Sequence, residues 1–105
     1  MKIAIGSDEK CYLTDQVVAQ VKERDHVVTL FGPLQDSVCD WPEVAREVAE
    51  AVASGAAEEA ILFCWTGTRV SLAANKVPGI RAALCDDAET ARGARLWNKA
   101  NALWA

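Results

Sequence analysis

Apolar positions along this chain follow two alternating patterns. Short continuous apolar runs, the pattern typical of buried strands, occur at residues 2–7, 27–31, 60–64 and 80–84. Apolar residues at helical spacing follow the first two runs, first Leu13, Val17 and Val21 and then Val44, Val48 and Val52. The chain therefore predicts strands and helices in strict alternation, with further helices over residues 68–75 and up to about Trp97.

Turn and capping residues mark the ends of these elements. Asp40-Trp-Pro-Glu43 combines a helix N-cap, an early proline and an acid at the third helical position. Asp86 and Glu89 repeat the capping pattern before the last helix, and residues 77–79 predict a turn into the fourth strand. The apolar tail at residues 101–105 predicts a fifth strand.

Strict alternation of strands and helices is typical of the α/β class. Right-handed crossovers then favour a doubly wound, Rossmann-like αβα sandwich of three layers around a parallel sheet of five strands, with the expected order 2-1-3-4-5. In that order the winding reverses between strands one and three. Ligands are therefore expected beyond the carboxyl ends of these two strands.

Composition and charge add the expected setting. The chain has 105 residues, 51% of them apolar, and no apolar run near the ~20 residues that span a bilayer. The formal net charge is −4 and the basic residues are scattered, which argues against nucleic acid and membrane partners. The first residues enter a strand pattern without the features of a signal peptide. We therefore expect one cytoplasmic domain over residues 1–105.

The cysteines are widely and unevenly spaced, at Cys11, Cys39, Cys64 and Cys85. They form no C-x-x-C pair, and His26 is the single histidine in the sequence. His26 precedes the second strand, where we expect it to be solvated. This spacing argues against disulfides and a zinc site, which fits a reducing compartment. We also expect no cofactor.

Candidate chemistry begins at Cys64, at the end of the third strand. A thiol near a helix N-terminus can have a lowered pKa and act as a base or nucleophile. Free cysteine also serves often as a small buried apolar side chain, so both roles stay open. Thr66 and Thr68 offer hydroxyls, Gly67 permits close backbone approach, and Arg69 adds a positive charge; ordinary capping of the next helix is the alternative.

Asp8 and Glu9 follow the first strand, at the other side of the expected crevice. Adjacent carboxylates can bind a sugar hydroxyl, share a proton or hold a cation, whereas a solvated loop is the alternative. Trp65 lies inside the candidate loop, where it must either line the pocket or close it.

Three motifs resemble the type B ribose-5-phosphate isomerases and the related galactose-6-phosphate isomerase subunits. They are Ile3-Ala-Ile-Gly-Ser-Asp8, Asp40-Trp-Pro42 and the run from Ile61 to Cys85, and the likeness covers nearly the whole chain. The resemblance implies isomerisation of an aldose phosphate to a ketose phosphate, without metal, through an enediolate. It also implies a dimer or a higher homo-oligomer whose pocket is completed across a subunit boundary.

The resemblance assigns roles to individual residues. Cys64 aligns with the family's catalytic thiol, and Thr66 would assist proton movement between oxygens. Backbone amides of the loop would stabilise the developing oxyanion. The predicted substrate-binding residues are Asp8, Glu9, Trp65, Gly67, Thr68, Arg69, Asn75 and Asn98.

Four positions depart from the family pattern. Glu9 replaces a histidine, Trp65 and Arg69 replace loop glycines, and Trp97 replaces the histidine thought to open the sugar ring. Relatives also continue past the fifth strand through a helix with arginines for the phosphate, a contact that Arg69 is the candidate to supply. The sugar itself is not fixed by the sequence.

Three functions remain in competition. The first is a sugar-phosphate aldose-ketose isomerase that uses a cysteine base. The second is a catalytically weakened relative that serves as a structural or regulatory subunit, alone or in a hetero-oligomer with a related chain. The third, a receiver-like module, would need an aspartate where this chain has Cys64.

Overall fold

The structure, a computed structural model, describes residues 1–7, 9–35, 41–63, 68–85 and 87–104. Its elements are β1 (Lys2–Ser7), α1 (Tyr12–Glu23), β2 (Val27–Phe31), the 3-10 turn η1 (Gly32–Gln35), α2 (Trp41–Ala53), β3 (Glu59–Phe63), α3 (Thr68–Asn75), β4 (Ala82–Leu84), α4 (Ala88–Asn98) and β5 (Ala102–Trp104). Strands and helices alternate throughout, so the expected α/β class is confirmed.

The parallel sheet has the order β2-β1-β3-β5-β4. The expected order 2-1-3-4-5 is therefore wrong for the last two strands, because β5 lies between β3 and β4. Asn101, just before β5, explains this insertion. Its carbonyl accepts the Ala60 N–H at 3.0 Å, and its own N–H donates to the Arg81 carbonyl at 3.0 Å. One residue thus joins the starts of both neighbouring strands.

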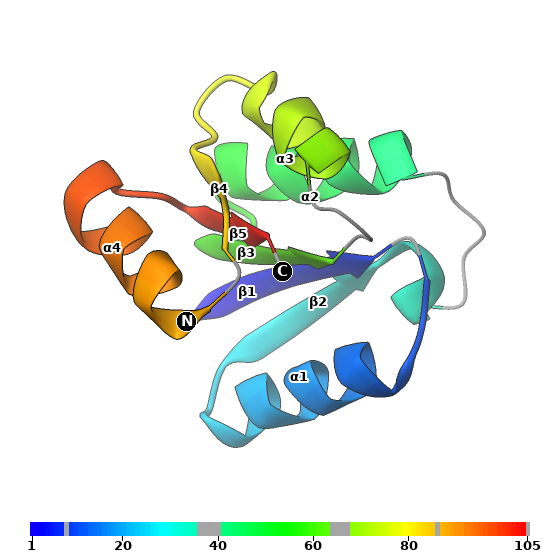
Figure 1. Cartoon of the computed structure of the whole chain (residues 1–105). Coiled ribbons are helices and arrows are strands. Elements are labelled where there is room, and N and C mark those ends of the chain that lie inside the picture. The colour runs from blue at the N-terminus through cyan, green and yellow to red at the C-terminus, as the bar shows by residue number, and fades with distance from the viewer. Residues whose placement is uncertain (8, 36–40, 64–67, 86, 105) are drawn as a thin grey trace.

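Helices cover both faces of the sheet, as a three-layer sandwich requires. Helix α1 lies on one face, and α2 and α3 lie together on the other (Figure 1). Ala83 pairs in register with Leu103, which pairs with Ile61, so these side chains share a face. Ile61 packs in the core under α1, and Ala83 lines a groove with Ala94 of α4. Helix α4 therefore covers the same face as α1.

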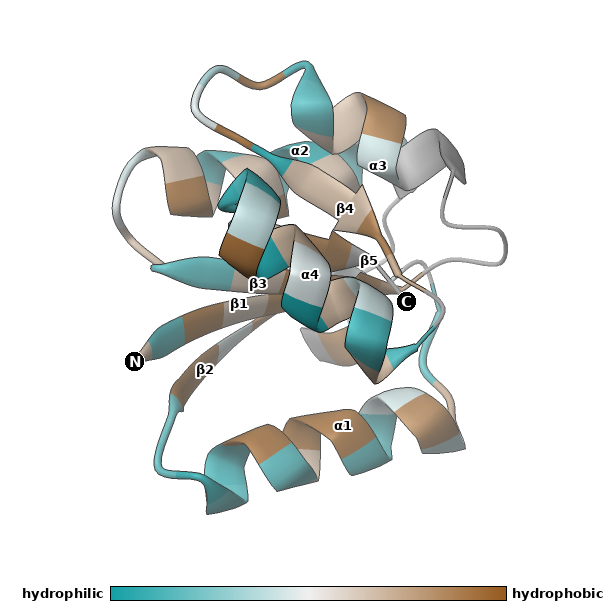
Figure 2. Cartoon of the chain, turned by 60° about the vertical axis from the view of Figure 1, so that its left-hand side comes forward, coloured by the Kyte–Doolittle hydropathy of each residue, from teal (hydrophilic) through white to brown (hydrophobic). Residues whose placement is uncertain are grey.

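The two halves of the core differ in side-chain size. Under α2 and α3, strand residues Ala4, Ala60 and Leu62 are buried against Val44 and Val48. The opposite half contains larger strand side chains, namely Ile3, Ile5 and Phe63. Figure 2 shows the hydrophobic colouring concentrated on the strands between the helical layers. Small residues on one face let α2 pack closely against β1. This packing fixes the position of the carboxyl ends of the strands.

Several expected boundaries shift when the tertiary contacts form. β4 begins at Ala82 rather than residue 80, because the Arg81 N–H donates to the Asn101 side chain at 2.8 Å. The cap of α4 is Asp87, whose carboxylate accepts the Thr90 N–H at 2.7 Å; the expected cap, Asp86, lies outside the described residues. These corrections move element ends by one or two residues and leave the alternation unchanged.

The expected inward face of α1 is confirmed at Val17 and Val21, which pack against the core, but is wrong at Leu13. Leu13 is 59% exposed, whereas Thr14 is buried. Thr14 Oγ1 accepts the Cys11 N–H at 3.0 Å and donates to the Cys11 carbonyl at 2.9 Å. These two bonds make a polar side chain suitable for the buried position. His26, expected in solvent, is half-buried, and no hydrogen-bond partner for its Nδ1 is found within the described residues.

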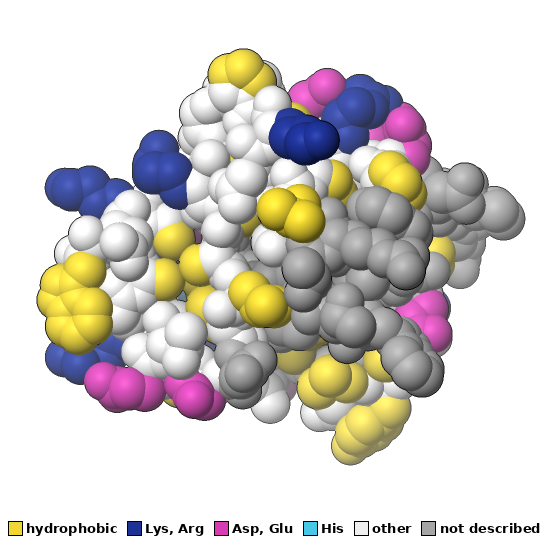
Figure 3. Space-filling model, turned by 45° about the horizontal axis from the view of Figure 1, so that its top comes forward, with side chains coloured by type: hydrophobic (Ala, Val, Ile, Leu, Met, Phe, Trp, Pro, Cys, Tyr) yellow, Lys and Arg dark blue, Asp and Glu magenta, His cyan; other side chains and the backbone are white. Residues whose placement is uncertain are grey.

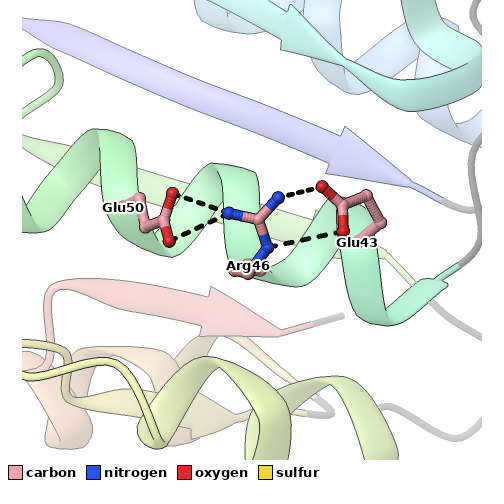
Figure 4. A network of polar contacts seen from close by, with 3 residues as sticks. All are labelled: Glu43, Arg46 and Glu50. Carbon is pink, nitrogen blue, oxygen red and sulfur yellow. Dashed lines mark hydrogen bonds and ion pairs between the residues drawn. The ribbon is translucent and has the colours of Figure 1, made fainter.

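The outer surface of α2 carries an ion-pair network (Figure 4). Arg46 Nη1 donates to both carboxylate oxygens of Glu50 at 3.0 and 2.9 Å, while Nη2 and Nε bond to Glu43. Hydrogen bonds to Glu43 and then to Glu50 raise the pKa of Arg46 above its ordinary value. All three side chains are about half exposed, so the network contributes little to stability.

A membrane-spanning helix is not present in the part of the chain that the structure describes.

Candidate active site

The carboxyl ends of β1 and β3 meet at one edge of the sheet. Ser7, the last residue of β1, is the register partner of Phe63, the last residue of β3. The chain continues from these two paired residues into 8–9 and into 64–67, the two segments in which the sequence predicts chemistry. Helix α3 begins immediately afterwards at Thr68. The two candidate segments thus start from neighbouring positions in the sheet.

The predicted site residues fall into three groups. Asp8, Cys64, Trp65, Thr66 and Gly67 lie outside the described residues. Thr68 and Arg69 form the first turn of α3, where the structure describes the backbone. The remaining predicted residues, whose side chains are described, are Glu9, Asn75 and Asn98.

Glu9 lies at the expected edge and is exposed. Its N–H donates to Ser7 Oγ at 3.1 Å, so the buried Ser7 hydroxyl fixes the backbone where the chain leaves β1. Lys10, next in sequence, bonds to both carboxylate oxygens of Asp15 at 2.9 and 3.1 Å. Glu9 is therefore an exposed acid, and the lysine that follows it in sequence is paired with Asp15.

Gly32 forms the wall of the same edge behind Ser7. Its φ is +66°, and a Cβ built on it would lie 2.7 Å from Val44 Cγ2 and 3.0 Å from the Ser7 carbonyl oxygen. Neither the conformation nor the space admits a larger residue. Gly32 therefore lets the chain turn from β2 into η1 while α2 approaches the end of β1.

Helix N-termini gather at this edge because each helix follows the end of a strand. Of the helices that the structure describes, α1, α2 and α4 carry an acid in the first turn, namely Asp15, Glu43 and Glu89. Helix α3, which follows the candidate loop, carries none. The N–H groups and the dipole of a helix start favour an anionic ligand over a neutral one.

The first turn of α4 shows what such an N-terminus does to a carboxylate. Hydrogen bonds from Thr90, its backbone N–H first, hold the pKa of Asp87 below the ordinary value of an aspartate. The charged form is therefore favoured by the same donors that a helix start offers to a ligand.

Asn75 and Asn98 lie at the opposite end of the sheet, on the side where the strands begin. Asn75 ends α3 and bonds to the backbone of Ala82, the first residue of β4. Asn98 ends α4, a helix of 11 residues that starts beyond the end of β4 and runs back for about 16 Å. One chain therefore does not bring Asn98 together with Glu9, and the two can meet only between chains.

The surface around Asn98 is an open groove of about 510 Å³ along α4. Its lining residues are Ala83, Glu89, Thr90, Gly93, Ala94, Trp97 and Asn98. The Trp97 ring folds back over Gly93, where an added Cβ would lie 3.0 Å from the ring, and the side chain is 80% exposed. Figure 3 shows exposed apolar side chains in several separate places on one face of the molecule.

Two of the four cysteines, Cys11 and Cys85, lie within the described residues. Cys11 is exposed, whereas Cys85 is buried and its Sγ donates to the Ala83 carbonyl at 3.5 Å. Within the described ranges, no group of three histidine, cysteine or acidic side chains is arranged to hold a metal ion. The expectation of a reaction without a cofactor stays a prediction.

Sequence reasoning missed the residues that hold the end of α4. Each donates a side-chain hydrogen bond to a backbone carbonyl: Arg81 to Lys99, Arg95 to Ala100 and Asn101 to Gly79. Their spacing gives no periodic signal, because each acts on a segment that is distant in sequence or lies beyond a helix end. The sole signal was the position of Arg81 and Asn101 immediately before strands.

Comparisons with known proteins agree on one relationship. Residues 3–104 match the sequence model of the family described as Ribose/Galactose Isomerase. The ribose-5-phosphate isomerase B of Escherichia coli is 40% identical over 103 residues, which are 97% of this chain and 69% of that protein. A D-erythrulose-4-phosphate isomerase of Mycolicibacterium smegmatis is 36% identical over 107 residues, covering 98% of this chain and 70% of its own length.

Solved structures give the same result for the fold. The Clostridium thermocellum ribose-5-phosphate isomerase B superposes with a TM-score of 0.88 at 47% sequence identity. The match covers 98% of this chain and 70% of that one. The described sheet and its helices are thus those of a known group of structures.

Proposed function

Because the chain belongs to the ribose/galactose isomerase family, we propose that it interconverts an aldose phosphate and a ketose phosphate. The reaction would use Cys64 as the base and need no metal or other cofactor. Thr66 would be the second catalytic residue. The substrate class is a small phosphorylated sugar, as the names of the relatives suggest.

The proposed chemistry is a proton transfer between two carbons. The Cys64 thiolate takes the proton from C2 of the open-chain aldose, and the electrons of that C–H bond form the C1–C2 double bond of an enediolate. The Thr66 hydroxyl relays a proton from O2 to O1. The Cys64 thiol then returns its proton to C1, which gives the ketose. Amides of the loop, including those of Trp65 and Gly67, would stabilise the oxyanion.

The observation that carries this proposal is the register pairing of Ser7 with Phe63. It gives the segments after β1 and β3 adjacent starting points, which a site with substrate-binding carboxylates at Asp8 and Glu9 and a base at Cys64 requires. The α3 N-terminus, with no acid in its first turn, supports an anionic intermediate there. Thr68 and Arg69, at that helix start, are the proposed contacts to the phosphate.

We also propose that the working protein is a homodimer or a higher oligomer. Asn98 lies at the edge of the sheet opposite Glu9, so Asn98 would serve the pocket of a second copy. The exposed Trp97 beside it supports a contact between chains. Asn75 stays a predicted ligand whose amide is bonded to Ala82. Nucleic acid and membrane are not among the proposed partners, and a cytoplasmic location stays a prediction.

Proton NMR in deuterated water tests the function directly. The protein and its Cys64→Ser form are incubated with D-ribose 5-phosphate, D-erythrose 4-phosphate, or the 6-phosphates of D-allose and D-galactose. We expect the parent protein to incorporate deuterium at C2. The rate of incorporation should be lower by about 10³-fold or more in Cys64→Ser. Exchange that persists without the thiol would exclude Cys64 as the base.

A second candidate is a subunit without its own activity. Support comes from Trp97, an exposed indole of the kind that is usually buried against another chain, and from the replacements at Glu9, Trp65 and Arg69. No exchange with any of the four sugars, together with a stable complex with a full-length family member in sedimentation, would favour this function.

A further inference from the structure

The segment after α4 has an unusual backbone that is held from two sides. Asn98 is followed by Lys99, whose φ of 54° and ψ of 40° lie in the left-handed region. The N–H groups of Lys99 and Ala100 both donate to the Ala94 carbonyl. A side chain with a Cβ disfavours this conformation, so contacts beyond these two backbone bonds must maintain it.

Two guanidinium groups supply these contacts on consecutive carbonyls. Arg81 Nε donates to the Lys99 carbonyl at 2.7 Å, and Arg95 Nη1 donates to the Ala100 carbonyl at 2.6 Å. Bonds from a charged donor at these distances are stronger than neutral ones. The two carbonyls immediately after Asn98 are therefore fixed by cations from different parts of the chain.

Each cation is itself attached to the sheet. The Arg81 backbone N–H donates to Asn101 Oδ1 at 2.8 Å, and Asn101 Nδ2 donates to the Gly79 carbonyl at 2.9 Å. Arg95 Nη2 lies 2.8 Å from Glu59 Oε1 at the start of β3, where the Glu59 side chain is 25% exposed. The end of α4 is thus tied to the start of β3 and to the segment that leads into β4.

From this geometry we propose that Arg81 and Arg95 are positioning residues for Asn98. They hold the backbone after Asn98 in place. The side-chain amide of Asn98 is thereby already oriented to bind the substrate in the pocket of a facing copy. The inference rests on the proposed function, because it assigns a role to a residue of that site. An amide that must bind from across a subunit boundary loses most of its effect if it moves by about 1 Å.

Steady-state kinetics on single and double variants tests this role. Arg81→Ala, Arg95→Ala and the conservative Arg81→Lys and Arg95→Lys are compared with Asn98→Ala, using the sugar phosphate that the parent protein turns over fastest. We expect each alanine variant to raise KM by roughly fivefold, with kcat changed less, because binding and not proton transfer is affected. The lysine variants should recover part of the affinity, since one donor remains.

A matched control is available on the same helix. Arg92 pairs with Glu89 at 3.7 Å and is 69% exposed, and it reaches neither carbonyl. Arg92→Ala should leave KM unchanged. Glu59→Gln removes the ion pair of Arg95 and keeps the Ala100 carbonyl contact, so it should change KM less than Arg95→Ala. Circular dichroism at the assay temperature confirms that each variant is folded.

Double variants separate a positioning role from a general loss of structure. In the Asn98→Ala background, Arg81→Ala and Arg95→Ala should add little further change in KM, because the residue they position is gone. Full additivity, or arginine variants with the parent KM, would overturn the inference and leave the proposed function intact. An unchanged KM in Asn98→Ala would overturn both the inference and the assignment of Asn98. No turnover by the parent protein would overturn the proposed function and this inference together.

Discussion

The side chain of Asn75 bonds to both backbone groups of Ala82. Its Oδ1 accepts the Ala82 N–H at 2.8 Å, and its Nδ2 donates to the Ala82 carbonyl at 3.0 Å. The amide therefore occupies the place of a neighbouring strand on the outer side of β4, which is one of the two edge strands of the sheet. The last residue of α3 and the first residue of β4 are joined without a strand between them.

Removing this amide should weaken the attachment of β4. We predict that Asn75→Ala lowers the free energy of unfolding by about 1 kcal/mol, because water can replace two exposed hydrogen bonds only in part. Urea denaturation measures the change. Lys76→Ala, one residue later, is the control and should have no comparable effect. If both variants unfolded at the same urea concentration, the pairing with Ala82 would carry no stability.

Gly32 should tolerate no other residue. We predict that Gly32→Ala destabilises the fold by about 3 kcal/mol, since a positive φ is combined with a Cβ that would touch Val44 and the Ser7 carbonyl. Gly55→Ala is the matched control, because Gly55 also has a positive φ of 84° and its Cβ would meet nothing within 4 Å. Gly55→Ala should lower the free energy of unfolding by only about 1 kcal/mol. Equal thermal shifts in the two variants would show that the contacts at Gly32 do not matter.

The cap of α4 should give a pH-dependent contribution to stability. Asp87 has a lowered pKa in the folded chain, so its contribution is present above the unfolded pKa, near 4 for a free aspartate at about 25 °C, and is lost as pH falls through the folded value. Asp87→Asn keeps a capping oxygen but has no charge to lose. We therefore expect the parent protein to melt higher than Asp87→Asn at neutral pH, by a few degrees at most. The difference should vanish in acid, and a difference that is constant over the whole pH range would contradict the cap assignment.

Trp97 should select substrates that need no ring opening. In the resembling family a histidine at this position is thought to open the sugar ring, and an indole does not exchange a proton at neutral pH. A four-carbon sugar phosphate has no free hydroxyl that closes a furanose ring, and one relative is a D-erythrulose-4-phosphate isomerase. We predict that kcat/KM for D-erythrose 4-phosphate exceeds that for D-ribose 5-phosphate by roughly 10²-fold.

Histidine substitution provides the check on that preference. Trp97→His should narrow the gap between the two sugars, while Trp97→Phe should leave it wide, since phenylalanine lacks an exchangeable proton as well. Coupled spectrophotometric assays of both sugars give the ratio for each variant. A preference for the five-carbon sugar in the parent protein would exclude ring opening as the basis of selectivity.

The sequence predicted those parts of the fold that local patterns control. The bounds of α3 were predicted as observed, because its ends coincide with clear changes in residue type. The order of the last strands was not predictable in this way. It depends on Asn101 bonding to Ala60 on one side and to Arg81 on the other, and no periodicity encodes contacts over 20 or more residues.

The same distinction between local patterns and long-range contacts applies to the candidate site. The sequence correctly indicated that the ends of strands one and three adjoin, because the alternation and the handedness of crossovers suffice for that. The separation of Asn98 from Glu9 was not foreseen from the residues. It follows from the length and direction of α4, which the sequence predicts, together with the position of β5, which it does not.

The placement of β5 also has a consequence for synthesis of the chain. Among the described strands β4 pairs with β5 alone, so residues 82–84 have no strand to pair with until residues 102–104 have left the ribosome, and Asn75 holds only Ala82. Before that moment the nascent protein would carry an unfinished edge at β3, which invites pairing with other chains. Stalling of translation shortly before Ala102 should therefore yield an aggregation-prone intermediate rather than a nearly native one.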